Sequence, residues 1–152
     1  MVCEMSGSKA THQLWGGLAH GSLVVVDSAP LIYVLDNHPQ FSAQFEGLFE
    51  AHSRGAIAIA LSTITLSEVL TGPLKAGAVG LAKRYEHALL KFDVVTVTAS
   101  IAILSAQLRA QYRLKTPDAI QLATALEIGA AALVTHDRDF AEVTGIKVLL
   151  GD

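Results

Sequence analysis

Short, continuously apolar runs alternate along this chain with segments whose apolar residues recur at helical spacing. The apolar runs predict five strands, at residues 22–27, 56–62, 93–98, 131–135 and 146–150. Strands that are apolar on both faces are typical of a parallel sheet covered by helices on both sides. Right-handed crossovers between such strands give a doubly wound α/β domain. The sequence therefore predicts a three-layer sandwich with a mostly parallel central sheet.

Helical segments fill the intervals between these strands. We predict helices directly after Ser28, at residues 41–52, from about Thr65, and at 79–92, 100–113 and 117–128. The pair Gly72-Pro73 is predicted to interrupt the helix that begins near Thr65. Residues 1–22 lack the apolar run of a secretory signal, and we expect a loosely ordered N-terminal extension there. One domain is then expected over residues 23–152.

The composition narrows the class of protein and its surroundings. Hydrophobic residues make up 51% of the chain, which favours a packed globular domain over disorder. Cys3 is the only cysteine, so an internal disulfide and a thiolate zinc site are excluded, and we expect a reducing, cytoplasmic location. No apolar run reaches the roughly 18 residues of a membrane span. The net charge of −3 does not attract polyanions, so such a substrate needs a local basic patch or bound metal ions.

Acidic residues recur where the predicted strands end. Asp27 ends the first strand, and Glu68 lies about one turn into the helix after the second. Asp137 follows the fourth strand, with Asp139 two residues on. Ligands of doubly wound sheets bind outside the carboxyl ends of the strands, so Asp27, Glu68 and Asp137 are expected at one edge. Asp118 joins them if the helix that it opens starts above the same edge.

Each acid also has a purely structural interpretation. Asp27 can cap the helix that follows it, and Thr65 and Glu68 match a capping box. Thr116 can cap the next helix start, where Asp118 is favoured by the helix dipole. The segment THDRDF is compatible with a simple polar turn. Taken singly, these structural roles are favoured, but none of them requires the acids to converge on one edge.

A cluster of carboxylates needs a positive partner, because like charges in a cleft repel one another. Mg²⁺ and Mn²⁺ prefer carboxylate and water oxygens. A cation held by several acids can activate a water molecule and stabilise a leaving oxygen on phosphate, which is the chemistry of metal-dependent nucleases. Serine-nucleophile hydrolase and P-loop interpretations lack their motifs in this chain. The acids therefore predict metal-dependent phosphate chemistry.

Four segments carry a likeness to a known family: VVVDSAPLIYVLD, LSTITLSEVL, TPDAIQLATAL and LVTHDRDF. Their order and spacing resemble the PIN-domain family, and in particular the VapC-type toxins of prokaryotic toxin–antitoxin pairs. The resemblance implies a PIN-like nuclease domain over residues 23–152 that acts on RNA, forms a homodimer and binds a cognate antitoxin. It also implies Mg²⁺ or Mn²⁺ at four acidic positions, which here are Asp27, Glu68, Asp118 and Asp137.

The same resemblance points to two supporting residues and two departures. Thr135 matches a hydroxyl position near the family's metal site, and Asp139 is a secondary candidate in the acidic turn. His136 stands where the family often has Asn, and we expect a solvent-facing turn residue there. The segment before the first strand is also longer than is usual in the family. Neither departure removes an acid, so an active site is favoured.

Three basic residues precede Asp118 and are candidates for RNA contact: Arg109, Arg113 and Lys115. They can neutralise RNA phosphates near the predicted site. A solvated helix end explains them equally well, because cations are favoured near the C-terminus of a helix.

Two alternatives to a nuclease are a phosphatase-like α/β domain and a PIN-like binding module. A haloacid-dehalogenase-type phosphatase wants a second acid two residues after the first, where this chain has Ala29. A binding module without a metal site typically loses acids, whereas all four are present here. Both observations favour the metal-dependent ribonuclease.

Overall fold

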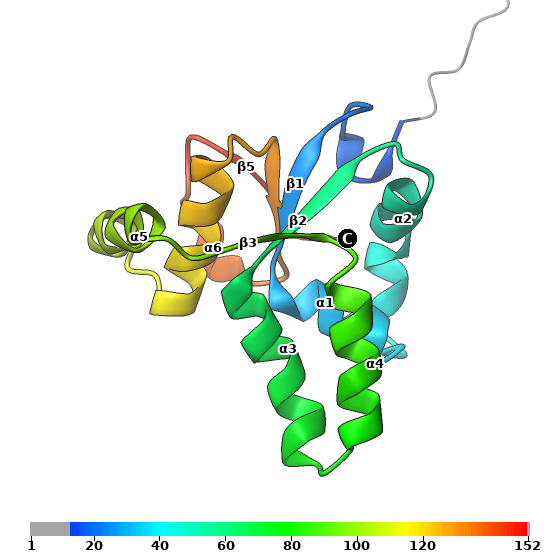
Figure 1. The fold of residues 1–152 in the computed structure, drawn as a ribbon. Coiled ribbons are helices and arrows are strands. Elements are labelled where there is room, and N and C mark those ends of the chain that lie inside the picture. The colour runs from blue at the N-terminus through cyan, green and yellow to red at the C-terminus, as the bar shows by residue number, and fades with distance from the viewer. Residues whose placement is uncertain (1–12, 152) are drawn as a thin grey trace, which may run out of the picture.

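A single five-stranded sheet organises the computed structural model, which describes residues 13–151 (Figure 1). The strands are β1 (Leu23–Val26), β2 (Ala58–Ser62), β3 (Asp93–Val95), β4 (Ala132–Val134) and β5 (Lys147–Leu149). Their order across the sheet is β3-β2-β1-β4-β5, and every neighbouring pair is parallel. The predicted doubly wound α/β fold is confirmed, with a sheet that is parallel throughout.

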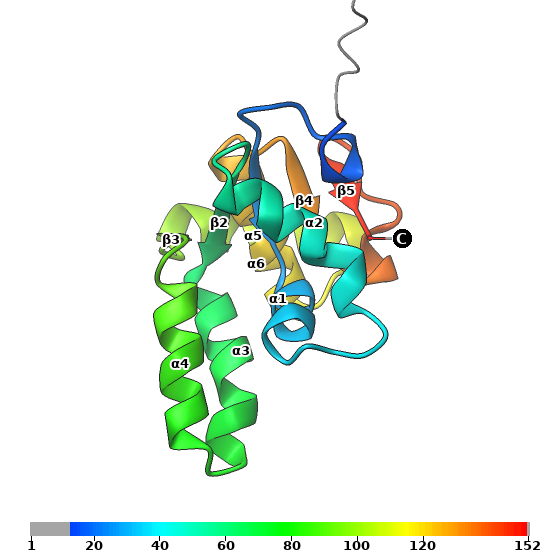
Figure 2. The ribbon, with the colours of Figure 1, turned by 90° about the vertical axis from the view of Figure 1, so that its right-hand side faces the viewer.

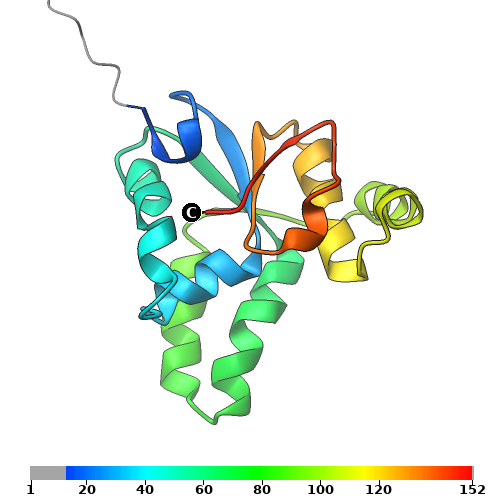
Figure 3. The same ribbon diagram turned by 180° about the vertical axis from the view of Figure 1, so that it is seen from behind.

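Six α-helices in residues 13–151 cover the two faces of this sheet (Figures 2 and 3). They are α1 (Ser28–Leu35), α2 (Ser42–Ser53), α3 (Thr63–Lys75), α4 (Val79–Leu89), α5 (Ala99–Tyr112) and α6 (Thr116–Glu127). The first four share one hydrophobic cluster, and α5 and α6 share the other. None of these described helices combines the length and the apolar character that a membrane crossing requires.

The central strand β1 shows how the chain builds a core on both faces of the sheet. Val24 and Val26 belong to the cluster of α1–α4, whereas Val25 belongs to the cluster of α5 and α6. All three side chains are fully buried. Successive side chains of a strand point to opposite faces, so a strand buried on both faces must be apolar at every position.

The helix α3 continues through Gly72-Pro73, so the predicted interruption there is wrong. Pro73 lies in the last turn of the helix, where its missing N–H removes a single backbone hydrogen bond. The helix begins at Thr63 rather than near Thr65, because Ser62 accepts the N–H of Ile64 and forms the cap. Together α3 and α4 form a hairpin that extends away from the edge at which the strands end (Figure 1).

The expected loose extension over residues 1–22 does not hold for residues 13–22. Leu14 and Leu18 are buried in the cluster of α1–α4. The indole N–H of Trp15 donates to the Gln44 carbonyl at 2.7 Å, and its ring packs against Phe45. Two leucines and a tryptophan at this spacing bury apolar area that a loose segment leaves in water. The rest of the predicted extension lies outside the described residues.

The packing of residues 13–22 predicts an unequal response to two leucine truncations. Leu18→Ala should lower the free energy of unfolding by about 2–4 kcal/mol, because it removes a buried side chain and leaves a cavity. Leu74→Ala is the matched control, since Leu74 is 55% exposed on α3. Chemical denaturation of both variants measures the difference. Equal midpoints for the two variants would show that residues 13–22 do not contribute to the core.

Candidate metal centre

Asp27 and Thr135 meet where the neighbouring strands β1 and β4 end. The Thr135 hydroxyl donates to Oδ2 of Asp27 at 2.8 Å, and it accepts the backbone N–H of Asp137 at 3.1 Å. The backbone N–H of Asp27 also donates to the Val134 carbonyl at 2.8 Å. Thr135 therefore links an acid at the end of one strand to an acid that follows the next strand.

Asp27 is a buried carboxyl group held by hydrogen bonds on both oxygens. It caps α1, where Oδ1 accepts the backbone N–H of Ser28 at 2.8 Å, so its predicted capping role is confirmed. Only 6% of the residue is exposed. Burial raises the pKa of Asp27, the hydrogen bonds from Thr135 and Ser28 partly oppose this, and the nearby charge of Asp137 adds to it. The geometry therefore fixes the orientation of this group before any ligand binds.

Asp118 lies in the first turn of α6 and faces the other acids. Burial is the largest cause that raises the pKa of Asp118 to about 6, and the charges of four acids add to it. These acids are, in order of effect, Asp27, Asp137, Glu68 and Asp139. The helix start of α6 thus lies above the carboxyl edge of the sheet, and the sequence-predicted acids come together there.

Glu68 enters the cluster from α3 and does not cap its helix, because Ser62 forms that cap. One of its carboxylate oxygens, Oε1, is buried and has no hydrogen-bond partner within residues 13–151. Burial and the charge of Asp27 raise the pKa of Glu68, and the side chains of Ser28 and Gln121 lower it. Because Ser62 caps α3, the capping-box interpretation of Thr65 and Glu68 is wrong.

Asp139, the secondary candidate in the acidic turn, lies beside Asp118 and Asp137. One carboxylate oxygen from each of Asp118, Asp137 and Asp139 lies within 4.8 Å of the others. The Asp139 backbone N–H donates to Asp137 Oδ1 at 2.9 Å in the short helix η2 (Arg138–Phe140). Asp139 itself is exposed, so this side of the cluster opens to solvent.

The acid cluster suits a hard divalent cation. Within the described part of the chain, the single ion pair joins Lys83 to Glu86, so no basic side chain neutralises the cluster. Two oxygens that bind one Mg²⁺ at about 2.1 Å lie at most about 4.2 Å apart, so oxygens within 4.8 Å of one another reach a common ion after a small side-chain shift. The unpaired buried Oε1 of Glu68 is a further oxygen that lacks a positive partner. The donor set thus has the chemistry of a magnesium or manganese site.

His136 is not the solvent-facing turn residue that we expected. Its Nδ1 and the Tyr33 hydroxyl are hydrogen-bonded at 3.0 Å, and its ring packs against Phe41 and Phe45. The sequence offered no pattern for this contact, because Tyr33 lies 103 residues away along the chain. His136 anchors the segment that carries Asp137 to α1 and α2.

The three candidate RNA-contact residues are exposed at the junction of α5 and α6. Arg109 donates from Nε to the Leu114 carbonyl at 3.3 Å, and Arg113 ends α5 in a left-handed conformation with φ of 56°. Lys115 is the cap residue of α6, so the predicted Thr116 cap is wrong by one position. The three cations thus lie just before Asp118 along the chain, and Arg109 also stabilises the turn between the helices.

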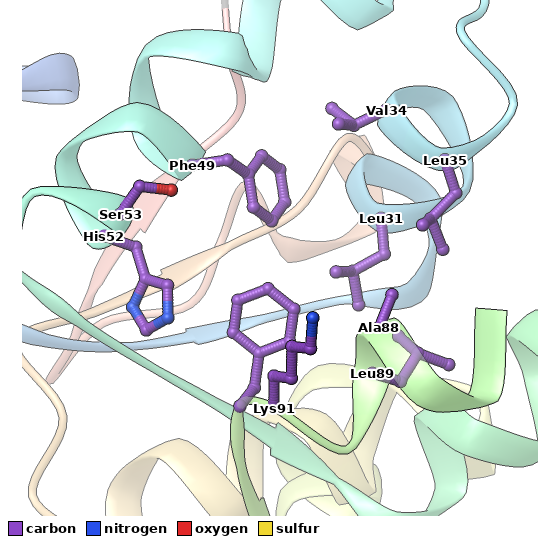
Figure 4. Close-up of a pocket in the computed structure, with 10 residues that line it drawn as sticks. Leu31, Val34, Leu35, Phe49, His52, Ser53, Ala88, Leu89 and Lys91 are labelled. Atoms are coloured by element: carbon purple, nitrogen blue, oxygen red, sulfur yellow. The ribbon is translucent and has the colours of Figure 1, made fainter. Parts of the chain in front are cut away.

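A separate hollow of about 500 Å³ opens between α1, α2 and the end of α4 (Figure 4). Its walls are mainly apolar and include Leu31, Leu35, Phe49 and Phe92. His52 lines the same hollow, called the groove from here on, and its buried Nδ1 has no hydrogen-bond partner within residues 13–151. No acid of the cluster lines this groove, so it is a second surface of a different chemical character.

Comparisons with known proteins agree with this geometry. The model of the PIN domain family matches residues 24–146. A solved toxin–antitoxin complex from Klebsiella pneumoniae contains a chain that is 31% identical, with a TM-score of 0.67 over 81% of this chain and 94% of that one. No curated protein matches this sequence.

More distant solved structures share the fold. VapBC2 from Rickettsia felis, bound to a DNA fragment from its promoter, has 18% identity and a TM-score of 0.71 over 86% of this chain and 99% of that chain. VapC20 from Mycobacterium tuberculosis, described as a toxin that cleaves the sarcin-ricin loop, has 15% identity and a TM-score of 0.63 over 78% and 92% of the two chains. Family match and structural likeness together identify this chain as a member of the PIN-domain family that groups with the VapC-type toxins.

Proposed function

We propose that this protein is a Mg²⁺- or Mn²⁺-dependent endoribonuclease and the toxin of a toxin–antitoxin pair. Asp27, Glu68, Asp118 and Asp137 are its metal-binding and catalytic acids, and Thr135 and Asp139 support them. The observation that carries the proposal is the convergence of these acids without a basic partner in residues 13–151; burial first, and then the charges of the other acids, raise the pKa of Asp118 to about 6. Perturbed acids of this kind are typical of functional sites.

The chain's own residues prepare the site for phosphodiester hydrolysis. Thr135 and the backbone of Ser28 hold the Asp27 carboxylate, so this group loses little conformational entropy when a ligand binds. With its pKa at about 6, Asp118 is mostly a carboxylate at pH 7 and is able to bind a cation. When bound, a divalent cation supplies a Lewis acid for the phosphate and a water of lowered pKa. The exposed position of Asp139 leaves this side open to a phosphate backbone.

RNA is the proposed substrate for reasons of charge and family. With a net charge of −3, the chain must attract a polyanion locally. Cations bound at the acids and the exposed Arg109, Arg113 and Lys115 provide that attraction near the α6 start. VapC20, which has the same fold, is described as a toxin that cleaves the sarcin-ricin loop, and this supports RNA as the substrate class.

We also propose two protein partners in the cytoplasm, a cognate antitoxin and a second copy of the chain. The Klebsiella relative is described as a toxin–antitoxin complex, which supports the antitoxin. The apolar groove between α1, α2 and α4 offers a surface for an apolar segment of such a partner. Exposed apolar side chains on the helices or directly after them support self-association: Leu74, Val79, Leu90 and Ile103.

The central prediction concerns Asp118→Asn. Loss of one metal-binding carboxylate should slow RNA cleavage by roughly two or more decades, because the variant binds the cation less well. Cleavage by purified protein is followed with Mg²⁺, Mn²⁺ or EDTA. Asp93→Asn is the control, since Asp93 is exposed and lies where β3 begins, at the opposite edge of the sheet.

The alternatives give different results in the same assay. A phosphatase-like domain hydrolyses a phosphomonoester such as p-nitrophenyl phosphate and leaves RNA intact. A binding module retains RNA or a partner without cleaving either. Wild-type cleavage that persists in EDTA, or an Asp118→Asn variant as fast as wild type, would contradict the metal-dependent mechanism.

A second prediction uses pH and metal-free protein. The raised pKa of Asp118 means that the folded state binds this proton more tightly than the unfolded state does. The contribution of Asp118 to the free energy of unfolding is therefore largest at low pH, and it falls as the pH rises from about 4 through about 6. At pH 7, metal-free Asp118→Asn should melt above wild type by roughly 2–5 °C, and the gap should narrow at pH 5. If Asp118 serves only the helix dipole, the variant melts below wild type instead.

A third prediction tests metal binding through thermal stability. Saturating Mn²⁺ should raise the melting temperature of wild type by roughly 5–10 °C, because the ion binds the native cluster and not the unfolded chain. Asp27→Asn keeps the cap of α1 but loses a charge, so its rise should be clearly smaller. Differential scanning fluorimetry with Mn²⁺ and with EDTA measures both proteins. An equal rise in the melting temperatures of the two proteins would show that Asp27 is not a metal ligand.

A further inference from the structure

One buried hydrogen bond joins the two helices that carry Glu68 and Asp118. The carboxamide nitrogen of Gln121 on α6 donates to the Thr65 hydroxyl on α3 at 2.7 Å. Both residues are fully buried. Gln121 lies three residues after Asp118, and Thr65 lies three residues before Glu68. Residues at this spacing share one face of a helix, so each acid lies one turn from the bond.

This bond connects the two helical layers of the domain. The helix α3 packs in the cluster of α1–α4, and α6 packs in the opposite cluster with α5. Glu68 therefore belongs to one layer and Asp118 to the other, and the bond between Thr65 and Gln121 fixes the separation of their two helices.

Stability alone does not explain a glutamine at this position. Gln121 lies in a part of α6 whose apolar residues, such as Leu122 and Ala125, are also fully buried. Its carboxamide oxygen is buried and has no partner within the described residues. A buried acceptor without a donor destabilises the folded state, whereas an apolar side chain of similar volume would not. The Gln121 carboxamide therefore makes the fold less stable than an apolar side chain would. A role in the acid cluster explains why it is there.

We propose that Gln121, acting through Thr65, is a positioning residue that holds Glu68 in register with Asp118. The inference rests on the proposed metal-dependent function and adds a residue to its machinery. Metal ligands must be placed within about 0.5 Å of the productive geometry, and the groups behind them provide that precision. A loose contact between α3 and α6 therefore weakens cation binding even when the fold is intact.

Two substitutions at Thr65 separate positioning from packing. Thr65→Val keeps the shape of the side chain and loses the hydroxyl, so Mn²⁺ affinity should fall about tenfold. Thr65→Ser keeps the hydroxyl and loses a methyl group, so its Mn²⁺ affinity should stay near that of wild type while its melting temperature falls. If Thr65 only fills space, the order is reversed, and Thr65→Ser causes the larger loss of Mn²⁺ affinity.

Gln121→Leu and a control on the same helix complete the experiment. Gln121→Leu should weaken Mn²⁺ binding as much as Thr65→Val does, and the double variant should lose no more than either single variant. Thr124→Val is the control, because the hydrogen bond of the buried Thr124 hydroxyl is to the Ile120 carbonyl within α6 and not to an acid of the cluster. Isothermal titration calorimetry gives the Mn²⁺ affinity, and circular dichroism confirms the fold.

RNA cleavage under single-turnover conditions provides the second measurement. Thr65→Val and Gln121→Leu should lower the rate at saturating RNA about tenfold and leave the apparent KM for RNA unchanged. Wild-type Mn²⁺ affinity in Thr65→Val would overturn the positioning role and leave the proposed function standing. If Gln121→Leu fails to fold, the pair of Thr65 variants still decides the outcome. A wild-type protein that binds no Mn²⁺ would overturn both the proposed function and this inference.

Discussion

Repulsion among carboxylates at one edge of the sheet is the constraint on which the site depends. The parallel topology brings Asp27 and Asp137 together, because β1 and β4 are neighbours and end at the same edge. Burial of Asp27 strengthens the repulsion, and the chain opposes it with neutral donors, the Thr135 hydroxyl and the Ser28 N–H. These donors orient a carboxylate without cancelling its charge. A cluster that stays negative in this way retains its affinity for a cation.

Much of this arrangement follows from local sequence patterns. Strands buried on both faces require uninterrupted apolar runs, which is why β1, β2 and β4 stand out, and parallel strands place their carboxyl ends together. The caps predicted at Thr65 and Thr116 are misplaced for two different reasons. Ser62 and Thr65 both lie near the start of α3, and Ser62 forms its cap, whereas no side chain caps α6, which begins after Lys115. The site contacts of Gln121 and His136 depend on partners 56 and 103 residues away, and no local pattern encodes such pairs.

The domain presents two surfaces of opposite chemical character, one acidic and one apolar. The acid edge is polar, charged and open beside Asp139, whereas the groove between α1, α2 and α4 is mainly apolar. They share α1, whose capping residue is Asp27 and whose Leu31 and Leu35 line the groove. A partner seated in the groove therefore contacts the same eight-residue helix that begins at the acid cluster. This gives the groove a physical connection to the acids without direct contact.

The hydrogen bond between Thr135 and Asp27 spans 108 residues of chain, and this separation sets the order in which the protein matures. During synthesis, Asp27 leaves the ribosome long before β4, so its strand lacks one neighbour and its carboxyl lacks one donor. Contacts between residues this far apart form late in folding, after the loops between them have closed. A nascent or truncated chain that stops short of β4 holds Glu68 and even Asp118 without the frame that brings them together. The acid cluster is thus assembled only after β4 has been synthesised, rather than gradually along the chain.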